Sequence, residues 1–136
     1  MMQKITVETT VHAPIEKVWQ CWNKPEHITK WAFASDDWHA PSAENDLRVG
    51  GRFKTTMAAK DKSASFDFTG IYTEVVDHKV IEYTMDDGRK VTVAFVPDTN
   101  GIKIVETFDP ENENSIEMQR AGWQAILNNF KKYVEA

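Results

Sequence analysis

The segment "IKIVETF", residues 102–108, places a glutamate where a core side chain is expected. Its residues alternate between two faces as in a strand, so Glu106 shares a face with Ile104 and Phe108. A buried carboxyl group is costly unless it is paired, hydrogen-bonded or protonated, and one that lines a cavity is a candidate functional group. Two alternatives give Glu106 no such role: a bulge that turns it outward, or a fixed ion pair with Arg52 or another cation.

Three further polar side chains fall on predicted inward faces. Gln119 lies in the apolar stripe of the last predicted helix, about one turn before Trp123. There it either orients the polar group of a ligand or sits at a wet rim. Tyr72 and Tyr83 lie on predicted strands, and a buried tyrosine usually needs a partner for its hydroxyl. They either bind a ligand oxygen, bind each other or serve only in packing.

The segment from Trp31 to Gly51 gathers aromatic, acidic and histidine side chains without a strong helical period. Five of its side chains are of types that bind metals: Asp36, Asp37, His39, Glu44 and Asp46. Their spacing matches neither a helical HExxH pair nor paired CxxC sites, so we expect no metal site. Trp31, Phe33 and Trp38 are instead expected to plug one end of the core. Alternatively, Trp38 and His39 form part of a cavity mouth.

Other features of the sequence exclude several classes of protein. The single cysteine, Cys21, allows no intrachain disulfide and is expected to pack within a helix. The formal net charge is -5, and no basic face is available to bind nucleic acid. Phosphate-binding and dinucleotide motifs are absent, so no cofactor is expected. No apolar run approaches the ~20 residues that span a bilayer, so we expect no stable membrane insertion. The N-terminus resembles a strand rather than a signal peptide, so we expect a cytoplasmic location.

The elements that must position these residues follow one another without a linker, and the chain length fits one domain, residues 1–136. Alternating apolar side chains predict a first strand over residues 5–11. Pro14 is expected to begin a helix whose apolar stripe ends at Trp22, and Pro25 is expected to begin a second, short helix. Five further strand segments are separated by turn signals: residues 52–60, 64–76, 80–85, 90–96 and 102–108.

One long helix is predicted to follow the strands, with Ser115 as a good N-cap. Its apolar face is formed by Ile116, Trp123, Ile126, Leu127, Phe130 and Val134. An antiparallel meander followed by such a helix predicts an α+β fold, in which a curved sheet grips the long helix. A space left between the sheet and the helix is the default site for a ligand.

Several segments together resemble one known superfamily, and the resemblance covers essentially the whole chain. They are "HAPIEKVWQCW", "HITKWAF", "DDWHAP", "DLRVGGRFKTTM", "FDFTGIYTEV" and "GWQAILNNFKKYVE". The sequence is similar to the SRPBCC superfamily, the START-like or birch-pollen-allergen-like helix-grip domains. Within it, the sequence resembles the bacterial single-domain branch related to the C-terminal domain of the ninety-kilodalton heat-shock-protein ATPase activator. The resemblance implies a deep, mostly apolar cavity but no single function, because relatives include lipid carriers, cyclases and a co-chaperone module.

We therefore expect the chain to bind a small, largely apolar molecule, lipid-like or polyketide- or aromatic-like, in this cavity. The residues expected to line it are Trp38, His39, Met57, Phe68, Tyr72, Tyr83, Phe95, Glu106, Met118, Gln119, Trp123 and Ile126. One alternative is a cyclase- or hydrolase-like enzyme in which Glu106 acts as general acid or base. Another is a co-chaperone-type module with a chaperone as its partner. Against this, the eukaryotic activator has a further N-terminal domain, whereas this chain begins directly at the first strand.

Overall fold

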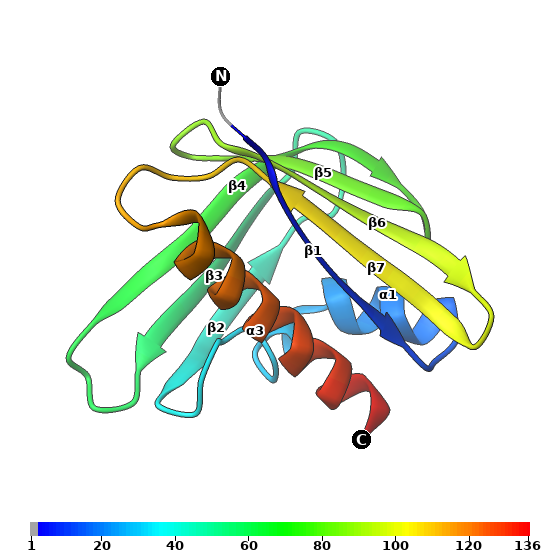
Figure 1. Ribbon diagram of the computed structural model, residues 1–136, viewed down its shortest axis with the longest axis horizontal. Helices are drawn as coiled ribbons and strands as arrows, with labels where there is room; N and C mark the ends of the chain where they lie inside the picture. The colour runs from blue at the N-terminus through cyan, green and yellow to red at the C-terminus, as the bar shows by residue number, and fades with distance from the viewer. Residues whose placement is uncertain (1–2) are drawn as a thin grey trace.

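Seven antiparallel strands form one strongly curved sheet in the computed structural model, which describes residues 3–136 (Figure 1). The strand order is β1-β7-β6-β5-β4-β3-β2, so β2 to β7 pair in chain order and the first strand pairs with the last. The strands are β1 (Ile5–Val11), β2 (Trp38–Asn45), β3 (Arg52–Ala59), β4 (Ser65–Val76), β5 (Val80–Met85), β6 (Lys90–Asp98) and β7 (Gly101–Phe108). The helices are α1 (Ile15–Asn23), α2 (Pro25–Ile28) and α3 (Ile116–Glu135).

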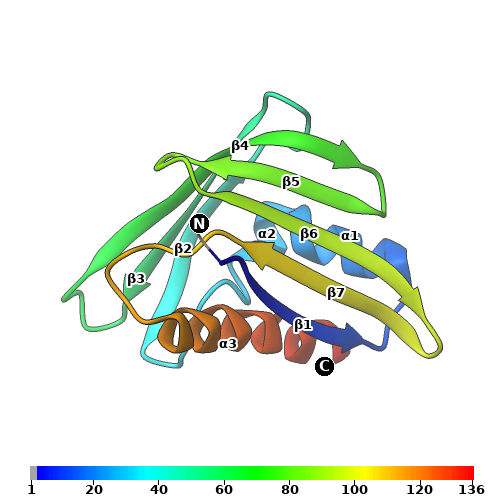
Figure 2. The same ribbon diagram turned by 45° about the horizontal axis from the view of Figure 1, so that its top comes forward.

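The long helix α3 lies on the concave side of the sheet and is fastened to the edge strand β1. Gln124 donates a hydrogen bond to the backbone carbonyl of Glu8. About two turns further along the helix, Lys131 donates another to the carbonyl of Thr10. Figure 2 shows α3 beneath β1, with β4 and β5 arching over at the far side of the sheet. These two hydrogen bonds hold α3 near the β1 edge of the curved sheet.

The core lies between the concave face of the sheet, α1 and α3. Ile5, Ile104, Phe108 and Phe130 are fully buried in it. Buried and more accessible side chains alternate along β7, as the sequence predicts. The predicted cap is also confirmed, because the Ser115 side chain accepts a hydrogen bond from a backbone N–H in the first turn of α3. The α+β fold with a curved sheet gripping a long helix, and with two short helices after the first strand, is confirmed.

The strand β2 was not expected from the sequence. The sequence indicates only a connection there, whereas Trp38–Asn45 pairs antiparallel with β3. β2 has a neighbour on one side alone, which is why it tolerates Pro41. Its register also shifts between His39 and Ser42. The proline and the register shift both interrupt the regular alternation of inward and outward side chains by which a strand is recognised in a sequence.

Of the three residues expected to form an aromatic plug, only Trp31 belongs to the buried core, between α1 and α3, whereas Phe33 and Trp38 are half-buried outside it. The Trp31 ring packs against Trp22 and Phe130, with ring centroids 4.9 and 4.8 Å away. The indole N–H of Trp31 donates a hydrogen bond of 2.8 Å to the carbonyl of Cys21, and Cys21 is itself buried in α1 as expected. These contacts fix the chain where it leaves the short helices and enters β2.

No helix within residues 3–136 has the length and apolar character needed to cross a membrane. Over the same residues, no three His, Cys, Asp or Glu side chains gather in an arrangement that would hold a metal ion. Asp36, Asp37 and Glu44, from the acidic segment before and within β2, are exposed to solvent.

Candidate functional site

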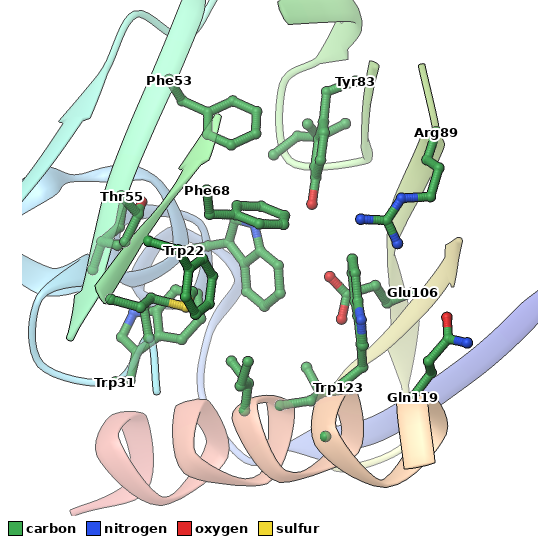
Figure 3. Close-up of a pocket in the computed structure, with 18 of the residues that line it drawn as sticks. Trp22, Trp31, Phe53, Thr55, Phe68, Tyr83, Arg89, Glu106, Gln119 and Trp123 are labelled. Carbon is green, nitrogen blue, oxygen red and sulfur yellow. The ribbon is translucent and has the colours of Figure 1, made fainter. Parts of the chain in front are cut away.

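A cavity of about 360 Å³ lies between the concave face of the sheet and the first half of α3 (Figure 3). Strands β3, β4, β5 and β7 contribute one side of its wall and α3 the other, with Trp22 and Trp31 at one end. The wall is mostly apolar and aromatic, with a few polar groups, as in sites that bind small organic molecules. Its volume is at the lower end of the ~300–1,000 Å³ range of such sites.

Nine of the residues that the sequence suggests for a cavity lie on this wall. Five come from strands: Met57, Phe68, Tyr72, Tyr83 and Glu106. Four come from α3: Met118, Gln119, Trp123 and Ile126. The two-residue alternation of strands and the three-to-four-residue spacing of the helix therefore identify most of the inward side chains.

Trp38, His39 and Phe95 lie elsewhere, and the expectation that they line the cavity is corrected. Phe95 on β6 is buried but packs edge-on against Trp19 of α1, with ring centroids 5.1 Å apart. Trp38 lies against Phe66 with centroids 5.9 Å apart, and His39 is exposed beside the β3–β4 hairpin. Phe95 points inward but is covered by α1, whereas Trp38 and His39 lie on the edge strand β2, away from the cavity.

Aromatic side chains form the part of the wall contributed by β3, β4 and β5. The Phe53 ring packs edge-on against Tyr83 with centroids 4.7 Å apart, and it also lies over Gly70. A Cβ at Gly70 would come within 2.9 Å of the Phe53 ring, so the glycine makes room for it. Phe68 packs edge-on against Trp123 of α3, with centroids 6.0 Å apart. The sheet and the helix thus present aromatic surfaces to the same space.

The mouth of the cavity lies between the start of β4 and the start of α3. Phe66 and Met118 both line the cavity, yet they are 51% and 65% exposed. A large apolar side chain that is exposed at the edge of an apolar cavity marks a place where a ligand can pass from water into the protein. A ligand is therefore expected to enter between these two side chains.

Glu106 points into the cavity, which decides between the alternatives that the sequence leaves open. β7 pairs without interruption, with Val7 of β1 and Val93 of β6 opposite Glu106, so no bulge turns its side chain outward. Arg52 is engaged elsewhere, in an ion pair of 3.0 Å with Asp86. Burial raises the pKa of the Glu106 carboxyl from its ordinary 4.5 to about 8, because the charged form is poorly solvated there. The carboxyl is therefore mainly protonated at neutral pH and acts as a hydrogen-bond donor.

Two further polar groups lie at the same end of the cavity. Figure 3 shows the Tyr83 hydroxyl and the Arg89 guanidinium directed toward the Glu106 carboxyl. Within residues 3–136, every fully buried side-chain nitrogen and oxygen has a hydrogen-bond partner. The Tyr83 hydroxyl and the Glu106 carboxyl have no partner among these residues. Their oxygens are therefore not fully buried but are accessible from the cavity. Asp87 accepts a hydrogen bond of 2.8 Å from Arg89 Nε and holds it in place. Burial raises the pKa of Tyr83 well above its ordinary 10, so its hydroxyl stays protonated.

Tyr72 and Gln119 also lie on the wall, but their polar atoms bind protein groups. The Tyr72 hydroxyl donates a hydrogen bond to Asn45 Oδ1, and Asn45 Nδ2 donates one of 2.7 Å to the carbonyl of Asn23. Gln119 holds the loop before α3, because its Oε1 accepts from the N–H of Glu111 at 2.8 Å and its Nε2 donates to the carbonyl of the same residue. Gln119 is buried rather than at a wet rim. Both side chains therefore tie elements together.

We expect Tyr72→Phe to lower the free energy of unfolding by about 1–2 kcal/mol, because it leaves the partly buried Asn45 amide without its donor. Urea unfolding followed by circular dichroism measures this loss. Tyr83→Phe is the matched control, since it removes a hydroxyl that has no partner in residues 3–136. It should change the free energy by less than about 0.5 kcal/mol. An equal loss in both variants would contradict the assignment of Tyr72 as a structural tie.

Gly122 is a place on the wall where α3 presents no side chain. It lies four residues from both Met118 and Ile126, so the three positions share the face of the helix that lines the cavity. A Cβ added at Gly122 meets no heavy atom within 4 Å. This glycine was not among the residues expected from the sequence to line the cavity.

Two further wall residues, Thr55 and Arg89, were not expected from the sequence. Thr55 is buried on β3 and lines the cavity. A signal was available for it, because it alternates in phase with Phe53 and Met57. Arg89 lies in the segment "DDGRK", just after the turn, and the composition of this segment indicates an exposed connection. Nothing local shows that its side chain reaches inward, since that depends on how the sheet curves.

Residues 12–135 match the family described as activator of Hsp90 ATPase homolog 1-like protein. The chain belongs to this family. The solution structure of a protein from Aeromonas hydrophila described as AHSA1-like is 49% identical, with a TM-score of 0.92 over 98% of this chain and 92% of that one. A protein from Cytophaga hutchinsonii is 59% identical, with a TM-score of 0.84 over 97% and 92% of the two chains. A protein from Chromobacterium violaceum is 26% identical, with a TM-score of 0.87 over 98% and 99%.

A curated relative outside this set is Glucans biosynthesis protein G 2 from Shewanella oneidensis. It is 31% identical over 88 residues, which make up 63% of this chain. The match spans 16% of the length of that protein. The membership of the activator-like family rests instead on a match that runs over nearly the whole chain.

Proposed function

We propose that this chain binds a small, largely apolar molecule in the cavity, with the polar group of that molecule beside Glu106. The observation that carries the proposal is the combination of an open wall of mostly apolar and aromatic side chains with side-chain oxygens at one end that have no protein partner in residues 3–136. The cavity of about 360 Å³ has room for on the order of a dozen non-hydrogen atoms, if each takes about the 30 Å³ of a water molecule in the liquid.

Apolar burial would supply most of the affinity. Each Å² of apolar surface removed from water contributes about 25 cal/mol before the costs of association. The best ligands gain about 1.5 kcal/mol for each non-hydrogen atom when they are very small, and about 0.3 kcal/mol when they are of drug size. A dozen such atoms correspond to dissociation constants in the micromolar to millimolar range. The few polar groups would then fix the orientation of the ligand rather than its affinity.

We expect n-decanol, an uncharged probe of suitable size, to bind with such a dissociation constant. A titration followed by two-dimensional ¹H–¹⁵N NMR tests this. The amide signals of Thr55 and Gly122, on the cavity wall, should shift with a saturable profile. The signals of Thr6 and Thr107, which hydrogen-bond to each other on the exposed face of β1 and β7, should not. Shifts scattered over the surface, or none up to saturation with n-decanol, would contradict the proposal.

A second candidate function is catalysis, and the observation that favours it is the buried Glu106 carboxyl. With a pKa near 8, this group exchanges its proton close to neutral pH, as a general acid or base does. A cyclase- or hydrolase-like enzyme of this kind would lose turnover in Glu106→Gln while it keeps the binding of n-decanol. A protein that only binds its ligand has no turnover to lose, so an assay with candidate carbonyl substrates separates the two.

The family also makes a chaperone a candidate partner, because its description refers to the activation of the Hsp90 ATPase. We propose this partner, together with a cytoplasmic location, as secondary to ligand binding. A measurement of the ATPase rate of a chaperone with and without the purified chain tests the first of these. No change in rate at saturating amounts of the chain would remove the co-chaperone proposal and leave the cavity proposal untouched.

A further inference from the structure

We propose that the polar end of the cavity, formed by Tyr83, Arg89 and Glu106, binds a carboxylate group, so that the ligand is a monocarboxylate amphiphile with a medium-length aliphatic or aromatic tail. The inference rests on the proposed function, because it assumes that the cavity is a ligand site. It adds the chemical class of the ligand and its direction in the cavity.

The three side chains converge from separate elements. Tyr83 lies on β5, Arg89 follows the β5–β6 turn and Glu106 lies on β7. Figure 3 shows their polar atoms around one point, with Trp22 and Trp31 at the opposite end of the cavity. Among residues 3–136, no hydrogen bond or ion pair joins any two of the three, although all line the cavity. Apart from the hydrogen bond of Arg89 Nε to Asp87 and a 4.0 Å contact of Arg89 Nη2 with Met85 Sδ, their donors remain available to a group placed between them.

The three groups act as donors toward that point. Arg89 is permanently charged. Within residues 3–136, Asp87 is the one carboxylate that pairs with it, and it does so through Nε. The planar guanidinium matches the geometry of a carboxylate. The Tyr83 hydroxyl is protonated, and the Glu106 carboxyl at neutral pH donates through its O–H. A carboxylate can accept from all three, an alcohol satisfies fewer of them, and an ammonium group would be repelled by Arg89.

The charges that surround Glu106 support the same assignment. From β5 and the following turn it is faced by Tyr83 and Arg89. The helix contributes only uncharged side chains to this part of the wall, Trp123 and Gln119. Glu111, in the loop before α3, also lines the cavity, but its Oε1 accepts a hydrogen bond of 2.7 Å from the N–H of Asn114. Arg89 is thus the cation at this end of the wall. When Glu106 ionises at alkaline pH, it would repel a bound carboxylate, so the affinity should fall as the pH rises through about 8.

The test compares three probes of equal chain length by isothermal titration calorimetry: sodium decanoate, n-decanol and decylammonium chloride, each at pH 6.5. We expect decanoate to bind about tenfold more tightly than n-decanol, as a charge-assisted hydrogen bond to Arg89 would give. Decylammonium should bind most weakly. We expect Arg89→Gln to remove the preference for decanoate and to leave the affinity for n-decanol within about twofold.

Arg48→Gln is the matched control, because Arg48 pairs with Asp46 two residues earlier, as Arg89 does with Asp87, but lies exposed on the surface. It should keep the preference for decanoate.

A second readout uses pH: decanoate should bind more weakly at pH 9.5 than at pH 6.5 in the natural protein, and this change should nearly vanish in Glu106→Gln.

The outcomes separate this inference from the proposed function. If n-decanol and decanoate bind equally well, the carboxylate inference is wrong and the cavity proposal stands. If Arg89→Gln weakens both probes to the same extent, Arg89 has a structural role and the inference is again wrong. If none of the three probes binds to protein that circular dichroism shows to be folded, both proposals fail.

Discussion

Gly122→Phe is expected to weaken the binding of n-decanol at least tenfold and to leave the protein at least as stable as the natural one. The added side chain would project from α3 between Met118 and Ile126 into the cavity, where a Cβ meets no heavy atom within 4 Å. A benzyl group would occupy more than half of the room for about a dozen atoms. Replacement of a helical glycine also removes its conformational penalty, which contributes about 0.5 kcal/mol here. Filling a cavity with apolar atoms adds to this gain.

Two measurements check the Gly122→Phe prediction. Calorimetry should show the affinity for n-decanol reduced at least tenfold, and urea unfolding should show an unchanged or higher free energy of unfolding. Gly122→Ala serves as the control, since it gains about 1 kcal/mol from helix propensity while it leaves most of the cavity empty. Its affinity should stay within about threefold of the natural protein. Normal binding of n-decanol by Gly122→Phe would show that the probe binds elsewhere.

Glu106→Gln is expected to remove most of the pH dependence of stability between about pH 5 and pH 8. The folded protein holds the Glu106 proton up to a pKa of about 8, whereas the unfolded chain releases it near 4.5. The contribution of Glu106 to the free energy of unfolding is therefore fully present below pH 4.5. It falls as the pH rises from there to about 8, because the unfolded state then binds fewer protons than the folded state. At 1.36 kcal/mol for each pH unit, the natural protein loses on the order of 3 kcal/mol across the window and then levels off. Glutamine has no proton to lose, so it escapes this penalty.

Urea unfolding at a series of pH values measures the effect in both proteins. Asp86, Asp109 and Glu135 have pKa values lowered by hydrogen bonds, so their contributions fall below about pH 4.5 and have the opposite sign. Glu74→Gln is the control, because Glu74 is exposed on β4, and it should keep the slope of the natural protein. The same slope in Glu106→Gln as in the natural protein would mean that the Glu106 carboxyl ionises normally in the folded state.

The inward position of Glu106 could be predicted from the sequence because β7 is a regular central strand. It has partners on both sides, so the apolar alternation of Ile102, Ile104 and Phe108 continues through the glutamate without a bulge. The stripe of α3 was equally clear. In both elements the buried side chains recur with the period of the backbone, two residues in the strand and about 3.6 in the helix. This pattern can be read from a single sequence.

The remaining parts of the site depend on features that the local sequence does not contain. Arg89 follows an ordinary polar turn, and only the curvature of the sheet brings its guanidinium over Glu106. The roles of Tyr72 and Gln119 depend on their partners, which come from β2 and from the loop before α3. Phe95 has the predicted inward direction, but α1 covers it, so it belongs to the core and not to the cavity. Burial could be predicted at these positions, whereas the neighbour that each side chain meets could not.

The most direct test of a cavity that holds an amphiphile with its polar group beside Glu106 is an intermolecular NOE spectrum of the protein saturated with decanoate. We expect the methylene protons next to the carboxylate to give NOEs to the Tyr83 ring, and the terminal methyl protons to give NOEs to the ring of Trp22 at the opposite end of the wall. NOEs from the probe to exposed side chains alone, with none to Tyr83, Trp22 or Trp123, would contradict the account.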